Sequence, residues 1–95
     1  MEVELHLPDD FEATMWDAKG YFPNAKLTVG ATTYILNFYD PSRLAQEIAD
    51  ATKSMGFFHE PNLVVVSQVN RIQLQQAVRK LAESNGLRQL SRLNG

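Results

Sequence analysis

The chain has 95 residues, a formal net charge of −2 and no cysteine. This length fits one domain with one hydrophobic core, and the lack of cysteine excludes disulfides, zinc–thiolate sites and thiol nucleophiles. The charge is divided unevenly, because residues 1–50 carry nine acidic and three basic side chains whereas residues 51–95 carry two acidic and six basic ones.

Two segments bear on secretion and membrane insertion. Residues 1–6 alternate between acidic and apolar side chains and lack the basic start and apolar run of a secretory signal. The longest aliphatic run, residues 63–66, is far shorter than the roughly 20 apolar residues that cross a bilayer. The absence of cysteine suits a reducing compartment. These features predict a soluble, cytoplasmic protein without a membrane partner.

The first half of the chain predicts an antiparallel sheet. Residues 3–7 alternate as in a half-buried strand, and residues 26–29 and 32–39 predict two strands joined by a Gly30–Ala31 hairpin turn. Residues 10–19 predict a short helix, with an aromatic loop as the alternative. Asp9 and Glu12 resemble a capping box for that helix. The strand side chains expected to face the core are Leu27, Val29, Tyr34, Leu36 and Phe38, with Asn37 on the opposite face.

The second half predicts two long helices and one strand. Asp40–Pro41 is a strong helix start and Gly56 an end, while Asn70 and Asn85–Gly86 bound the second helix. Residues 63–66 do not alternate, which predicts a central or parallel strand buried on both faces. The expected core-facing stripes are Leu44, Ile48, Ala51 and Met55 in the first helix, and Leu74, Ala77, Val78, Leu81 and Ala82 in the second.

These elements predict an α+β fold that forms a two-layer sandwich. A mixed sheet of about four strands carries both long helices on one face, in the chain order β, short α, β, β, α, β, α. Residues 1–95 are expected to form a single domain. Residues 86–95 form an amphipathic tail that either docks on the domain or takes part in association.

A ligand site is conceivable where the long helices begin. Helix N-termini offer free amides and a partial positive charge, and Arg71 opposes the dipole of its own helix unless an anion or an acidic partner lies nearby. Ordinary helix capping explains the other polar residues equally well. The residues of this candidate anion site are Tyr39, Ser67, Gln68, Asn70 and Arg71, beside the capping Asp40.

Nucleic-acid binding is the alternative suggested by the basic second half. Arginine and glutamine contact phosphates and base edges, and Arg71, Gln75 and Arg79 recur every four residues. The density of positive charge is nevertheless low, and Glu83 interrupts it. The residues concerned are Arg71, Arg79, Lys80, Arg88 and Arg92.

Protein association is the leading functional hypothesis. The tail keeps leucines beyond the last helix cap, and aromatic residues follow the first strand; such side chains are common at interfaces, although aromatics between strands more often close a core. The sequence thus predicts a non-catalytic interaction or accessory module that forms a homodimer. The expected interaction residues are Leu87, Leu90, Leu93 and Trp16.

Catalysis, cofactors and metals find little support in the residue pattern. The two histidines, His6 and His59, lack metal-ligand spacing. No nucleophile elbow or phosphate-binding loop occurs in the sequence. We therefore predict no catalytic residues, no metal and no cofactor, with a small enzyme or ligand-binding domain as the remaining alternative.

Overall fold

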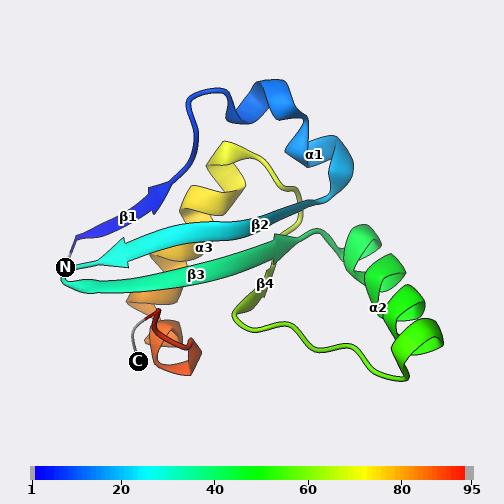
Figure 1. The fold of residues 1–95 in the computed structure, drawn as a ribbon. Coiled ribbons are helices and arrows are strands. Elements are labelled where there is room, and N and C mark those ends of the chain that lie inside the picture. The colour runs from blue at the N-terminus through cyan, green and yellow to red at the C-terminus, as the bar shows by residue number, and fades with distance from the viewer. Residues whose placement is uncertain (1, 94–95) are drawn as a thin grey trace.

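The computed structural model describes residues 2–93 and contains a four-stranded mixed sheet in the order β1-β2-β3-β4 (Figure 1). β2 pairs antiparallel with both β1 and β3, and β4 is parallel to β3. The strands are β1 (Val3–His6), β2 (Tyr21–Val29), β3 (Thr32–Tyr39) and β4 (Leu63–Val65). The helices are η1 (Phe11–Thr14), α1 (Trp16–Lys19), α2 (Pro41–Met55), α3 (Arg71–Glu83) and η2 (Gly86–Gln89).

The predicted α+β class and its mixed four-stranded sheet are confirmed. The turn at Gly30–Ala31 joins β2 to β3 as expected, and β2 begins earlier than predicted, at Tyr21. The short helix expected over residues 10–19 forms in two pieces, because Met15 takes a left-handed backbone conformation with φ 58° and separates η1 from α1.

Side-chain caps begin both long helices, as predicted. The Asp40 carboxylate accepts a hydrogen bond from the Arg43 amide, with Pro41 in the first helical position. The Asn70 side chain accepts one from the Gln73 amide. The capping box expected from Asp9 and Glu12 is wrong, because the first short helix begins after Asp10, whose side chain makes no capping hydrogen bond.

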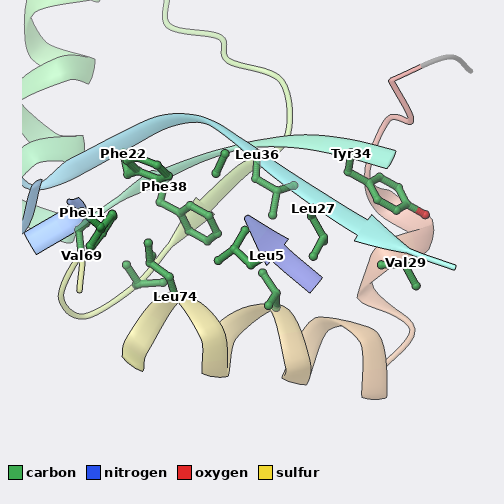
Figure 2. Packing of buried hydrophobic residues seen from close by; sticks show 13 residues of the cluster. Leu5, Phe11, Phe22, Leu27, Val29, Tyr34, Leu36, Phe38, Val69 and Leu74 are labelled. Carbon is green, nitrogen blue, oxygen red and sulfur yellow. The ribbon is translucent and has the colours of Figure 1, made fainter. Parts of the chain in front are cut away.

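The core lies between the sheet and α3 (Figure 2). Leu74 and Val78 of α3 are buried against side chains of the three antiparallel strands, which include all five strand residues predicted to face inward. Phe11 and Phe22 extend this core beyond the helix, with ring centroids 5.1 Å apart in an edge-to-face arrangement. The aromatic segment after β1 therefore closes the core.

α2 occupies a different place from the one predicted. It was expected to lie beside α3 on the sheet, yet it buries no residue and projects beyond the end of the sheet where β3 stops (Figure 1). The aromatic segment, with Phe11 and Phe22, fills the apolar sheet surface next to α3 that a second helix would need. Helical periodicity identifies an apolar stripe but not what covers it.

The strand at residues 63–66 also differs from its prediction. It is parallel to β3, as one of the two expectations had it, but β4 is an edge strand. Of residues 63–66, only Val66, just after β4, is buried, and Val65 is 47% exposed. The predicted stripe of α3 is also less buried than expected, because Ala77, Leu81 and Ala82 are half-buried. An unbroken aliphatic run does not by itself place a strand at the centre of a sheet.

Asn37 lies on the sheet face opposite α3 and is nevertheless buried. Its side chain accepts a hydrogen bond from the Asn24 amide and donates one to the Pro61 carbonyl. Asn24 stands at an irregularity in the β2–β3 register and has φ 56°. The buried amide thus fastens the segment after α2 onto the sheet.

The C-terminal segment, residues 86–93, docks on the domain. Leu87 and Leu90 pack against the core, and the Leu93 amide donates a hydrogen bond to the Thr33 carbonyl. Of the predicted amphipathic tail, residues 94 and 95 lie outside the described residues.

Candidate functional site

The polar residues predicted at the helix starts bind one another or nearby side chains. The Tyr39 hydroxyl donates a hydrogen bond to Glu60 at 2.7 Å, and burial together with that carboxylate raises the pKa of Tyr39 above its ordinary value. Ser67 donates to Gln73, and the Asn70 amide, besides capping α3, donates to Gln68. These contacts are structural and present no set of groups converging on a ligand.

Arg71, the residue that suggested an anion, has its partner within the chain. The guanidinium donates two hydrogen bonds to the Glu12 carboxylate at 2.9 and 3.0 Å and a third to the Pro8 carbonyl. These bonds lower the pKa of Glu12 and raise that of Arg71. Because Glu12 lies 59 residues earlier in the chain, no local sequence pattern could reveal this pair.

The Arg71–Glu12 pair gives a pH-dependent prediction. Glu12→Gln is expected to lower the free energy of unfolding near neutral pH and to lower it progressively less in acid, as Glu12 becomes protonated in the folded chain. Since the folded-state pKa of Glu12 lies below its ordinary value of 4.5, the stabilisation is present above the unfolded-state pKa and is lost as pH falls through the folded-state pKa. Urea denaturation of both proteins over a pH series from neutral to acid measures it. An equal loss at every pH would show that the charge of Glu12 contributes nothing.

A small cavity of about 70 Å³ lies beside the start of α3, between Phe11, Trp16 and Asn70. The buried Trp16 Nε1–H has no hydrogen-bond partner within residues 2–93. The cavity holds about two water-sized groups at about 30 Å³ each, and the carboxylate residues Glu12 and Asp17 line it. It is a place for bound water more than for an anion.

The basic residues predicted for nucleic-acid binding have different surroundings in the folded chain. Arg71 is paired with Glu12, and Arg79 and Lys80 are exposed on α3. Arg88 and Arg92 lie together at the C-terminal segment, where both line a cavity of about 330 Å³. Arg88 and Arg92 thus share one cavity, whereas Arg79 and Lys80 each line a different one.

Most of the residues predicted to mediate association pack within their own domain. Leu87 and Leu90 are half-buried against the core. Trp16 packs edge-to-face on Tyr21 and Phe22, with ring centroids 5.8 and 5.1 Å away. Only Leu93 remains largely exposed, at 55%. The exposed apolar surface of a whole element lies instead on α2.

α2 is fixed to the domain through its first turn. The Asp40 amide donates a hydrogen bond to the Gly20 carbonyl at 2.8 Å. The Arg43 guanidinium donates to the Lys19 carbonyl, lies 4.3 Å from the centre of the Tyr21 ring and forms an ion pair with Glu47 at 2.7 Å. The direction in which α2 projects is therefore set by contacts at the end of the sheet.

The apolar side of α2 is incompletely covered by its own chain. We call Leu44, Ile48, Ala51 and Met55 the α2 stripe. Ile48 and Met55 are 40% and 63% exposed, whereas Leu44 and Ala51 are partly covered. Just beyond the helix, Phe57 is 60% exposed. Scattered single apolar residues are normal on a protein surface, but a stripe over three turns is an interaction candidate.

Comparison with family models, curated proteins and solved structures finds no match to this chain. The candidate site therefore rests on the geometry of the described residues.

One further group of side chains surrounds His6 on the sheet. His6 Nε2 lies 3.0 Å from Thr28 Oγ1, and Glu4 is 3.5 Å from the other ring nitrogen. Within residues 2–93, no three His, Cys, Asp or Glu side chains gather as metal ligands would. In the same part of the chain, every helix is too short or too polar to traverse a bilayer.

Sequence reasoning identified the α2 stripe but assigned it to the core. One feature of the sequence could have distinguished a stripe covered by the sheet from a stripe left for a partner. The side of α2 next to the stripe carries the small residues Ala45 and Thr52 in place of charges. An apolar stripe widened by small residues is typical of a helix that meets another helix closely.

Proposed function

We propose that this protein is a non-catalytic interaction module that forms a homodimer through the α2 stripe. The observation that carries the proposal is a 15-residue amphipathic helix that buries no residue in its own chain. A helix of this length is marginally stable in water without packing. Contact with a second stripe would supply the missing burial at about 25 cal/mol per Å² of apolar surface.

The stripe is complementary to itself, which favours a second copy over another partner. In an antiparallel pair centred between Ile48 and Ala51, Ile48 meets Ala51 of the partner subunit and Leu44 meets Met55 of the partner subunit. The large Ile48 then opposes the small Ala51, and the flexible Met55 side chain packs on Leu44. Such a contact has two-fold symmetry and closes as a dimer.

The charges of α2 permit this contact. Its ionisable residues are Arg43, Glu47, Asp50 and Lys53, so the helix carries no net charge and two copies do not repel each other. Arg43 is already bound to Glu47. A stable interface buries about 800 Å² per partner, more than four side chains supply, and the exposed Phe57 beside the helix end is suited to extend it.

A cytoplasmic, non-catalytic role is part of the proposal. The chain has no cysteine, which suits a reducing compartment. Two ionisable groups have partners within the chain: Glu60 accepts a hydrogen bond from Tyr39, and His6 lies against Thr28.

The proposal is tested by changing the stripe and measuring the molar mass in solution. Light scattering coupled to size exclusion is expected to give the wild-type protein twice its 10.7 kDa chain mass. Ile48→Glu is expected to give a folded monomer, because a carboxylate buried without a partner in an apolar contact costs several kcal/mol. Circular dichroism checks that the variant is folded.

Ile72→Glu provides the matched control. Ile72 is an isoleucine on α3 and is 67% exposed, so it receives the same substitution outside the stripe. This variant is expected to remain dimeric. A wild-type protein that stays monomeric at millimolar concentration would contradict the proposal, as would dissociation of the Ile72→Glu variant to the same extent as Ile48→Glu.

A further inference from the structure

The C-terminal segment is held against the free edge of β3, in line with β4. Arg92 pairs with Tyr34 in an antiparallel bridge. Asn62, which precedes β4 with φ 51°, holds Ser91 from both sides: its amide donates to the Ser91 carbonyl, and the Ser91 amide donates back to it, each at 2.8 Å. The segment is thus anchored at its end as well as by its leucines.

A cavity of about 330 Å³ lies between this segment, the end of α3 and the turn end of the β2–β3 hairpin. Its volume falls within the range of small-molecule sites, about 300–1,000 Å³. Figure 2 shows Val29 and Tyr34 at this end of the sheet, beside the C-terminal segment. The apolar lining comes from Val29, Tyr34, Leu87 and Leu90, and the charged lining from Arg88 and Arg92.

The charge of this cavity has one sign. No aspartate or glutamate lines it. Neither Arg88 nor Arg92 belongs to an ion pair within residues 2–93, where the arginines paired with carboxylates are Arg43 and Arg71. A guanidinium presents several donors in a plane that matches carboxylate and phosphate groups. Two uncompensated guanidiniums over an apolar floor fit a ligand that is acidic at one end.

We propose that this cavity binds a small organic anion. The acidic group, a carboxylate or a phosphate monoester, contacts Arg88 and Arg92, and a ring or short alkyl group lies on Leu87 and Leu90. The cavity holds about ten water-sized groups at about 30 Å³ each, which corresponds to an aromatic acid or an aryl phosphate. This site is remote from the α2 stripe in the chain and does not depend on dimer formation.

A polynucleotide fits the same surface less well. Nucleic-acid affinity comes largely from several phosphate contacts along a basic stripe, whereas Arg71 is bound to Glu12 and the remaining basic side chains of α3 line other cavities. Tyr34 is only 6% exposed and so offers no open face for a stacked base. The exposed pair of arginines at one cavity is suited to one acidic group.

The test is a titration of the ¹⁵N-labelled full chain with phenyl phosphate and with benzoate, followed by amide shifts. Saturable shifts at the amides of Thr32, Leu87 and Leu90 are expected for at least one probe, with a Kd below about 1 mM. The probe that binds more tightly identifies the preferred acidic group. Inorganic phosphate, which lacks the ring, and benzyl alcohol, which lacks the charge, are both expected to bind at least about tenfold more weakly.

Two charge-matched variants decide whether the arginines of the cavity are responsible. Arg88→Gln/Arg92→Gln is expected to weaken probe binding by more than about tenfold, and Arg79→Gln/Lys80→Gln to leave it nearly unchanged. The absence of saturable shifts, equal binding of benzyl alcohol, or equal losses in both variants would overturn the proposal. So would tighter binding of a single-stranded DNA oligonucleotide that depends on Arg79 and Lys80.

Discussion

Leu74→Ala is expected to lower the free energy of unfolding by about 2–5 kcal/mol. Leu74 is fully buried in the first turn of α3, where Figure 2 shows it below Phe38. The loss combines the transfer of apolar atoms from water with the cost of the cavity left behind. A domain of this size has a total stability of about 5–14 kcal/mol, so this single change removes a large part of it.

Leu81→Ala is the matched comparison for this prediction. Leu81 lies on the same helix and in the same predicted stripe, but it is half-buried and its side chain lies close to Gly86. A loss of about 1–2 kcal/mol is expected, within the usual range for a partly buried site. Urea denaturation followed by circular dichroism measures both variants. If Leu81→Ala cost as much as Leu74→Ala, the core would extend further toward the C-terminal segment than the burial indicates.

The parts of the fold that follow local rules could be predicted from the sequence. Alternating side chains identified the antiparallel strands and their inward residues, and Asp40 and Asn70 identified the starts of the long helices, because capping is a contact over three residues. The turn at Gly30 follows from the same kind of rule.

The features that the sequence did not reveal depend on contacts between distant residues. Glu12 binds Arg71, Asn62 holds Ser91, and Asn37 holds the chain after α2. Each partner is a common residue in an ordinary setting, and only the folded chain brings the two together. The position of α2 also depends on distant residues. Several apolar segments compete for the limited sheet surface, and the aromatic segment after β1 covers it together with α3.

The sequence indicated which types of residue a binding surface would use, but not where the folded chain puts them. The tail leucines were expected at an interface, whereas Leu87 and Leu90 complete the core of their own chain. The basic residues were grouped by proximity in sequence, whereas folding pairs Arg71 internally and gathers Arg88 and Arg92 over a cavity. Burial and pairing select which exposed groups remain available to a partner, and neither is a property of a single segment.

Gly20→Ala is expected to destabilise the protein by about 2–4 kcal/mol, by straining the backbone and by pushing α2 from its attachment. Gly20 ends α1 with φ 77°, a conformation that costs other residues about 1–2 kcal/mol. An added Cβ would lie 2.8 Å from the Cβ of Arg43 and 2.8 Å from an Asp40 carboxylate oxygen. Both belong to the first turn of α2 and its cap, so the helix must shift to admit the methyl group.

Gly56→Ala separates the two contributions. Gly56 ends α2 with φ 84°, and an added Cβ there would meet nothing within 4 Å. This variant should therefore lose only the backbone cost, about 1–2 kcal/mol, and keep α2 in place. Thermal or urea unfolding gives the difference, and molar mass in solution gives its consequence for the dimer. Gly20→Ala should weaken both stability and association. Equal losses of stability in the two variants would mean that the first turn of α2 moves without cost, and that the direction of the stripe is not fixed by the end of the sheet.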